Sequence, residues 1–474
     1  MNGGAGHSTM LLMTVMRALV LAAVALAAAA PNASAASFLR LDGATAGDQA
    51  GFSVAGAGDF NGDGRRDLIV GAPFVAPGGA AYVVFGPFSP GTLDLAALGS
   101  RGVVISGGSA NAMLGESVAP AGDVNGDGLA DVVVGAPGTA PSADGPRPGV
   151  GHAYVVFGSR SPANVNVARL GTRGIVLRGR HHEFPDAFGW SVTGAGDVNR
   201  DGRDDVAIAA PGNQGFEDEY TRGSAYVVYG RRHGTVDMAR LRGRGFRFGV
   251  GSAGDVLSVA GAGDVNGDRY DDVVVGDHGY RGTGAAYLAY GGRRGTVLIS
   301  GAPRGADLGY SVAGGGDVDG DGLDDIVLSE PQAHRNRFNQ SAGGAWLIRG
   351  SRRRGPIDVR TRGVELRGTA GDWAGFAVAL GRVDGDRMSD IATTERGSLA
   401  VVSGRRRMGP VSLPGGAAWL IDGTVEPNPG FSAPDSGGLT TVGVLGGGPV
   451  LSGAPIADHN GRENSGSAYV FLAP

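Results

Sequence analysis

Residues 51–73 read GFSVAGAGDFNGDGRRDLIVGAP, and this stretch returns along the chain with the same internal spacing. The close copies read LGESVAPAGDVNGDGLADVVVGAP (114–137), FGWSVTGAGDVNRDGRDDVAIAAP (188–211), VLSVAGAGDVNGDRYDDVVVGDH (256–278) and LGYSVAGGGDVDGDGLDDIVLSEP (308–331). Each copy holds a short apolar run, a loop of alternating carboxylates and a second apolar run. A fixed period of this kind indicates a repeat architecture.

The first 36 residues have the pattern of a secretory signal peptide. Arg17 precedes an apolar run at 18–30, which is too short to span a bilayer, and small residues follow it. We therefore expect cleavage near Ala35 or Ala36, secretion and no membrane span. The sequence contains no cysteine, so an exported chain has no disulfide bonds and bound metal is the obvious substitute. The net charge of −5 points to no particular partner, and we expect no nucleic acid.

The repeats predict an all-β fold. A third strand-like run follows each acidic hairpin, and there are seven such runs, at 81–86, 153–158, 225–230, 286–291, 345–350, 399–404 and 468–472. A fourth run follows six of them, at 103–107, 175–179, 246–249, 297–301, 364–368 and 419–423. The missing seventh matches residues 37–43 at the start of the mature chain, so we expect that strand to complete the last unit. Residues 37–474 are thus predicted to form a seven-bladed β-propeller. An open β-solenoid is the alternative, but it would not need a spare strand at the start.

The acidic loops have the spacing of a calcium site. Side-chain oxygens stand at positions 1, 3, 5 and 9, and position 7 can offer only its backbone carbonyl. An EF-hand is excluded because position 12 is an apolar strand residue instead of glutamate. We predict about five structural calcium sites with these residues: Asp59, Asn61, Asp63, Arg65, Asp67; Asp123, Asn125, Asp127, Leu129, Asp131; Asp197, Asn199, Asp201, Arg203, Asp205; Asp264, Asn266, Asp268, Tyr270, Asp272; and Asp317, Asp319, Asp321, Leu323, Asp325.

The copies are not equivalent. A plain Asp/Asn/Gly turn without an ion is the alternative for each, but it leaves several carboxylates crowded together without a counter-charge. The fifth copy has four acids and is expected to bind most tightly. The fourth has Arg269 where glycine is preferred, which predicts weaker binding. In the sixth, Arg382 replaces the first ligand, and its guanidinium is a candidate substitute for the ion. The seventh hairpin has no acids.

These hairpins, which end in Gly-Ala-Pro and have Phe-Gly or Leu-Gly ahead of them, resemble the FG-GAP repeats of the integrin α-chain N-terminal propeller. The resemblance covers nearly the whole mature chain, and we expect none of the legs, transmembrane helix or cytoplasmic tail of a heterodimeric integrin receptor. It implies an adhesion or protein-interaction module of the free-standing bacterial type.

Two surfaces are candidates for binding. Arginine clusters on the side of the acidic loops (231–233, 293–294, 352–354 and 405–407) form a basic arc that could hold an anionic cell-surface polymer or could be a solvated turn region. The longest irregular loops (138–150, 180–187, 212–222 and 332–343) lie on the other side and carry Phe184, Phe216, Tyr220 and Phe338.

We expect an extracellular protein or glycan ligand and no enzymatic activity. The cluster at 181–183 (His-His-Glu) is the only dense group suited to acid-base or transition-metal chemistry, and no nucleophile motif accompanies it. A carbohydrate-binding propeller is the main alternative, and a secreted hydrolase is a further one.

Overall fold

The computed structural model describes residues 37–140, 147–148, 150–180, 187–212, 222–253, 257–292, 295–334, 341–371, 373–395, 398–413, 415–422, 442–444, 449–455, 457 and 461–472. The predicted signal peptide, residues 1–36, lies outside these ranges. The helices within them are single turns, and none could cross a bilayer.

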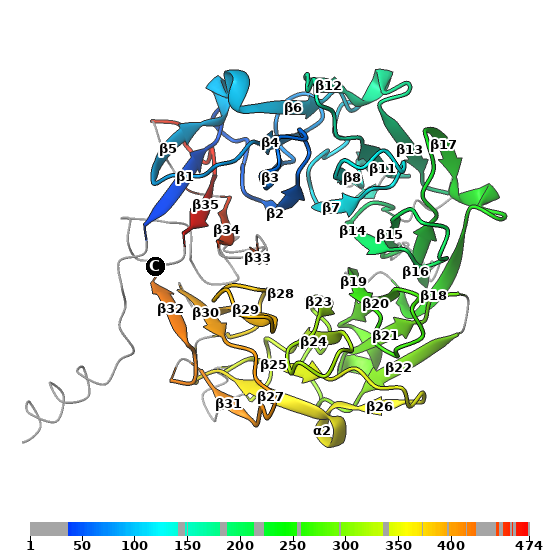
Figure 1. Ribbon diagram of the computed structural model, residues 1–474, viewed down its shortest axis with the longest axis vertical. Coiled ribbons are helices and arrows are strands. Elements are labelled where there is room, and N and C mark those ends of the chain that lie inside the picture. The colour runs from blue at the N-terminus through cyan, green and yellow to red at the C-terminus, as the bar shows by residue number, and fades with distance from the viewer. Residues whose placement is uncertain are drawn as a thin grey trace, which may run out of the picture.

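The described residues form seven antiparallel blades arranged in a ring (Figure 1), which confirms the predicted seven-bladed propeller. Blade one comprises β2 (Ser53–Gly58), β3 (Asp67–Ala72), β4 (Ala80–Val84) and β6 (Gly102–Ser106). Blade two comprises β7 (Val118–Gly122), β8 (Asp131–Ala136), β11 (His152–Val156) and β13 (Gly174–Arg178). Blade three comprises β14 (Ser191–Gly196), β15 (Asp205–Ala210), β16 (Arg222–Val228) and β18 (Gly245–Ala253).

The second half of the ring repeats this order. Blade four comprises β19 (Leu257–Gly263), β20 (Asp272–Asp277), β21 (Ala285–Ala289) and β22 (Thr296–Ser300). Blade five comprises β23 (Val312–Gly316), β24 (Asp325–Ser329), β25 (Gly344–Ile348) and β27 (Gly363–Arg367). Blade six comprises β28 (Val378–Gly381), β29 (Asp390–Glu395), β30 (Ser398–Val402) and β32 (Trp419–Asp422). A short pair, β9 (Thr139–Ala140) and β10 (Arg147–Pro148), stands apart from the blades.

Blade seven closes the ring with strands from both ends of the chain. It comprises β33 (Val442–Val444), β34 (Val450–Ala454), β35 (Ser467–Phe471) and the N-terminal β1 (Phe38–Asp42). Strand β1 pairs antiparallel with β35 over its full length, from Phe38 opposite Phe471 to Asp42 opposite Ser467. The predicted closure by the N-terminal strand is therefore confirmed.

Five blades carry an additional outer strand that the sequence analysis did not predict. The connection from strand three to strand four crosses to the preceding blade and pairs in parallel with its outer strand. The added strands are β5 (Gly91–Asp94), β12 (Val165–Asn166), β17 (Gly234–Asp237), β26 (Ile357–Asp358) and β31 (Val411–Ser412). Each of these connections therefore links neighbouring blades.

A single helical turn follows four of these added strands. The turns are η1 (Leu95–Ala97), η3 (Val167–Arg169), η4 (Met238–Arg240) and α2 (Val359–Arg362), and the side chain of Asp94, Asn166, Asp237 or Asp358 caps each one. The other two turns are η2 (Gly99–Arg101) and η5 (Tyr280–Gly282).

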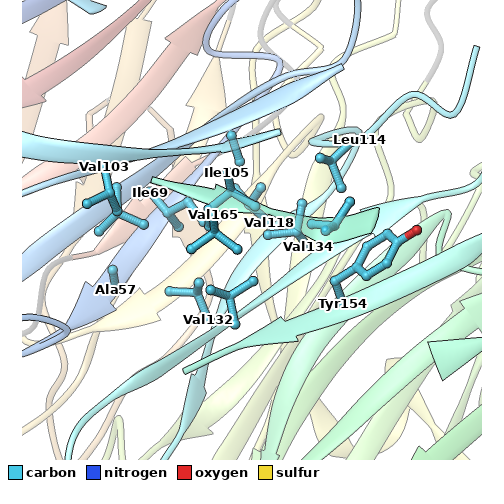
Figure 2. Close-up of a cluster of buried hydrophobic side chains, with 14 of the residues drawn as sticks. Ala57, Ile69, Val103, Ile105, Leu114, Val118, Val132, Val134, Tyr154 and Val165 are labelled. Carbon is cyan, nitrogen blue, oxygen red and sulfur yellow. The ribbon is translucent and has the colours of Figure 1, made fainter. Parts of the chain in front are cut away.

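The hydrophobic core is divided into seven clusters, one between each pair of adjacent blades. Figure 2 shows the cluster between blades one and two, where Ile69 and Ile105 pack against Val132 and Val134. The cluster that joins blades seven and one includes Leu39 and Leu41 of the closing strand. Each blade thus buries its faces only against its neighbours, which is how a ring of repeats supports a chain of this length.

Candidate metal centres

Each acidic loop is the turn between the innermost strand of a blade and the next strand outward. We number positions 1–9 from the first acid, so that Asp59 is position 1 and Asp67 position 9. The six loops are loop one (59–67), loop two (123–131), loop three (197–205), loop four (264–272), loop five (317–325) and loop six (382–390). All six lie on one side of the ring, here called the loop face, because each follows an innermost strand.

The loop backbone is left-handed at positions 4 and 6. In loop one these are Gly62 and Gly64, with φ of 73° and 81°. Arg200 in loop three (position 4, φ 60°) and Arg269 in loop four (position 6, φ 70°) adopt the same conformation without being glycine. Side chains cost about 1–2 kcal/mol in this region. The predicted strain at Arg269 is present, and loop three carries a comparable strain that was not predicted.

The carboxylate at position 1 organises the turn. In loop one, Asp59 accepts hydrogen bonds from the backbone N–H groups of Asp63 and Gly64, both at 2.9 Å. Asp123, Asp197, Asp264 and Asp317 accept the equivalent pairs in loops two to five. The main chain therefore holds each position 1 carboxylate on the inner side of its turn.

The aspartate at position 9 joins the loop to the end of strand three. In loop two, Asp131 Oδ2 accepts from Val124 N–H and Oδ1 from Gly158 N–H, both at 2.9 Å. All six loops repeat this arrangement, including loop six with Asp390. Burial raises the pKa of these carboxyls, to about 6 for Asp67, about 8 for Asp131 and Asp205, and about 7 for Asp272 and Asp325. No nearby positive charge among the described residues offsets the burial of these carboxylates, so a bound cation would favour their ionised forms.

The oxygen at position 3 is the clearest sign of a cation. Asn125 Oδ1, Asn199 Oδ1 and Asp319 Oδ1 are buried and accept no hydrogen bond from any described residue. A buried acceptor without a partner costs about 1–3 kcal/mol, so a native fold rarely leaves one unsatisfied. The same position is orphaned in loops two, three and five, and an ion among the ligand oxygens would satisfy all three.

In loops one and four the position 3 oxygen does accept a hydrogen bond. In loop one, Asn61 Oδ1 accepts from Asp63 N–H at 2.9 Å. In loop four, Arg354 from blade five donates to Asn266 Oδ1 at 3.3 Å and to Asp268 Oδ2 at 2.7 Å. The guanidinium thus occupies two of the ligands predicted for loop four, which is a second reason to expect weak binding there.

Loop five brings three carboxylates together. Ligand oxygens of Asp317, Asp319 and Asp325 all lie within 4.8 Å of one another. Asp319 Oδ2 also forms an ion pair with Arg349 Nε at 2.9 Å. The all-oxygen set fits a hard divalent cation such as calcium.

Loop six does not show the contact proposed from its sequence. Arg382 is exposed, and within the described residues no ion pair joins it to Asp384 or Asp386. The expectation that its guanidinium replaces the ion is therefore not supported, because the side chain points to solvent. The turn of the seventh hairpin, residues 445–448, lies outside the described residues.

Aspartates at position 8 connect consecutive loops, and the sequence analysis assigned them no role. The position 1 N–H groups of Asp123, Asp197 and Asp264 donate to Oδ2 of Asp204, Asp271 and Asp324 in the following loop, at 2.7, 2.7 and 2.9 Å. The position 8 N–H groups donate back to the position 1 carbonyls. Loops two to five are thus joined in series by pairs of hydrogen bonds on the loop face, here called the latch. The sequence signal for these contacts is the Asp-Asp pair that recurs at positions 8 and 9 of loops three, four and five.

We predict that Arg269→Gly stabilises the protein by roughly 1 kcal/mol, because it relieves a left-handed arginine. Calcium affinity at loop four should rise with it. The measurement is the free energy of unfolding in denaturant at fixed calcium. Arg387→Gly is the matched control, since Arg387 stands at position 6 of loop six without a positive φ. A gain from the control as large as from Arg269→Gly would contradict the strain argument.

The innermost strands enclose a central channel of about 860 Å³. Four aromatic residues that precede innermost strands line it at the end away from the acidic loops: Phe52, Trp190, Tyr310 and Phe376. The Tyr310 and Phe376 ring centroids are 4.8 Å apart, and Phe52 contacts Phe74, whose exposed fraction is 47%. Glu116 stands at the equivalent position of blade two and is buried. This channel mouth was not predicted as a surface, although these residues share one position of the repeat.

The described residues include only part of each of the two predicted binding surfaces. On the loop face, Arg354 pairs with Asp268, whereas Arg232, Arg353 and residues 405–407 are exposed. Arg293 and Arg294 lie outside the described residues. So do Phe184, Phe216, Tyr220 and Phe338, together with the cluster at 181–183, so the contact surface proposed on those loops stays a prediction.

Comparison with known proteins identifies the repeat. The FG-GAP repeat model matches residues 50–84, 114–156, 188–228 and 308–348, which contain the four loops that have both the full ligand set and glycine at position 6. Integrin alpha-4 of Xenopus laevis is 31% identical over 230 residues, and human integrin alpha-IIb is 33% identical over 236; each alignment covers 48% of this chain and 20% of the relative. Drosophila melanogaster integrin alpha-PS2 is 29% identical over 317 residues, which is 59% of this chain and 21% of that protein.

The fold and its acidic hairpins define a seven-bladed repeat propeller with acidic loops on one side. The chain carries FG-GAP repeats in four places, and over the aligned residues its propeller is similar to integrin alpha chains. It spans about a fifth of the length of the curated relatives it matches.

Proposed function

We propose that this protein is an extracellular, calcium-stabilised propeller that acts by binding another protein. Its similarity to integrin alpha chains favours an adhesion or interaction module rather than an enzyme. The signal-peptide pattern of residues 1–36 favours export, and cleavage near Ala35 or Ala36 belongs to the same proposal.

Calcium is the proposed ion of the acidic loops. The buried, unpartnered oxygens of Asn125, Asn199 and Asp319 support it, since each belongs to a loop whose predicted ligand atoms are all oxygens. Calcium would neutralise the carboxylates of each loop and would tie two strands to it. The protein residues supply the rest, because positions 1 and 9 are already fixed by backbone hydrogen bonds.

The single observation that carries the binding proposal is the aromatic mouth of the central channel. Half-buried rings of Trp190, Tyr310 and Phe376 line it, with Glu116 at the same level of blade two. Aromatic faces beside a carboxylate favour a cationic side chain, through cation–π attraction and charge. We therefore place the partner on this face, with an arginine or lysine directed into the channel.

A binding screen tests this assignment. The calcium-loaded protein is applied to an array of purified extracellular proteins, and each positive is repeated with Trp190→Ala/Phe376→Ala. A loop-face variant, Arg353→Ala/Arg406→Ala, is the matched control. The proposal expects binding to fall by at least about tenfold in the aromatic variant only, as for a loss of 1.4 kcal/mol or more.

The alternatives are separated when anionic polysaccharides and a glycan array are screened in parallel. Binding to an anionic polymer that the loop-face variant alone abolishes would favour a ligand held by the exposed arginines. Binding to a glycan array with no protein positives would favour a carbohydrate-binding propeller. Either result would contradict a protein partner at the channel mouth.

A further inference from the structure

A second type of metal site is present in blade five, at the end opposite its acidic loop. Glu330 follows β24 directly and replaces the alanine of the Gly-Ala-Pro motif; His334 lies four residues further on. Glu365 belongs to the outer strand β27. The FG-GAP pattern assigns no role to any of these side chains.

The strand register places the two glutamates on one face of the blade. Glu365 stands opposite Trp346, which in turn stands opposite Leu328. Directly opposed residues in antiparallel strands point to the same side, and Glu330 lies two residues beyond Leu328, so it shares that side. Leu328 and Trp346 belong to the cluster between blades four and five, which places the glutamates at the edge of that interface.

The three side chains converge on one point. His334 Nε2 lies 2.8 Å from Glu365 Oε1 and 3.5 Å from Glu330 Oε1. One ligand atom from each residue falls within 4.8 Å of the other two. Ligands around tetrahedral zinc are about 3.4 Å apart, given metal–ligand bonds of about 2.0–2.2 Å, so the cluster needs only small adjustments to hold an ion.

The hydrogen bonding of Glu330 provides the independent evidence. This residue is fully buried, yet neither carboxylate oxygen accepts a hydrogen bond from a described residue. His334 Nε2 likewise has no partner with hydrogen-bond geometry despite its short contacts. A buried ionised carboxylate left in this state is costly unless a positive charge lies beside it. The His334 imidazole is the only side chain paired with it in the described contacts.

We propose that Glu330, His334 and Glu365 bind a divalent transition-metal ion of the zinc class. Two carboxylates and one imidazole form a mixed oxygen and nitrogen set, which suits zinc and related ions better than calcium. Three protein ligands leave a fourth position for water. The bound ion would tie the connection after β24 to the outer strand β27 at the blade end that no acidic loop holds.

A bare ion-pair cluster is the competing interpretation. In that case His334 is protonated, and the Glu330 carboxylate beside it raises the pKa of the imidazole. Arg367 opposes this shift by its own charge. The two interpretations differ in what zinc does, because a protonated imidazole has no lone pair to offer a metal.

The test is a titration of the mature chain, saturated with calcium, with Co²⁺ and with Zn²⁺ at pH 7.5. We expect one strong site per chain, with visible absorption from Co²⁺ that indicates nitrogen and oxygen ligands in a low-symmetry site. His334→Gln and Glu330→Gln should weaken binding by at least about 100-fold, since even outer-shell changes cost about 10–100-fold. His233→Gln, an exposed histidine on the loop face, is the control and should bind like the parent.

Thermal melting in calcium without zinc shows whether each variant remains folded. A folded His334→Gln variant that binds Zn²⁺ with the same affinity as the parent would overturn the proposal, because the site would then lie elsewhere. A parent that binds no zinc above the level of His334→Gln would also overturn it and would leave the ion-pair cluster as the correct interpretation.

Discussion

Removing calcium with EGTA should lower the melting temperature of this protein by about 12 °C. If calcium is present at about 100 times its dissociation constant, each fully occupied loop stabilises the fold by about 2.7 kcal/mol. Loops one, two, three and five then contribute about 11 kcal/mol, and loop four, where binding is expected to be weaker, adds less. Unfolding entropies for a chain of this length convert that sum into a shift of about this size. The melting curve is recorded by circular dichroism in calcium and again in EGTA.

Two variants with single ligand substitutions serve as controls for the same experiment. Asp197→Asn removes a position 1 carboxylate, so the gap between the two melting curves should shrink by about one loop's share. Asp386→Asn, in the incomplete loop six, should leave the gap unchanged. Identical curves in calcium and in EGTA would show that the acidic hairpins hold the blades without an ion.

Glu116→Gln should stabilise the protein at alkaline pH and have little effect in acid. Burial raises the pKa of Glu116 from 4.5 to about 7. Below pH 4.5 the carboxyl is protonated whether or not the chain is folded, so it costs nothing. As the pH rises towards 7 the unfolded chain loses this proton first, and the folded state is penalised by up to roughly 3 kcal/mol. Glutamine removes that penalty.

The measurement is the free energy of unfolding at pH 5 and at pH 8, in saturating calcium. Glu463→Gln, at an exposed position, is the matched control and should change neither value. The carboxylates of the acidic loops titrate equally in all three proteins and cancel in the comparison. A gain from Glu116→Gln that is the same at both pH values would mean that packing, and not burial of the charge, is responsible.

Much of the fold could be predicted because each repeat is specified by residues that are close together in the sequence. The acidic turn, its glycines and the apolar runs on either side specify two strands in every copy. The unmatched strand at 37–43 then predicted closure of the ring, and β1 confirms it. The added outer strands were missed because they are two to four residues long, and only their pairing with the preceding blade makes them strands. An Asp or Asn before an apolar residue, as at Asp94 and Asn166, was their local signal.

The spacing of the acids predicts the ligands of each loop but not what surrounds them. Positions 1, 3, 5 and 9 depend on one loop only, and their role as ligands stays a prediction. The latch through Asp271, the competition from Arg354 and the exposure of Arg382 depend on neighbouring blades, so no single repeat reveals them. The cluster of Glu330, His334 and Glu365 is likewise formed by strands that are distant in sequence.

The most direct measurement of the central claim is the anomalous difference density of a crystal grown in millimolar calcium. We expect peaks inside loops two, three and five, coordinated by Asn125, Asn199 and Asp319, a further peak in loop one and a weaker one in loop four. Loop six should be empty. Absence of density at loops two, three and five would contradict the claim that these hairpins are calcium sites.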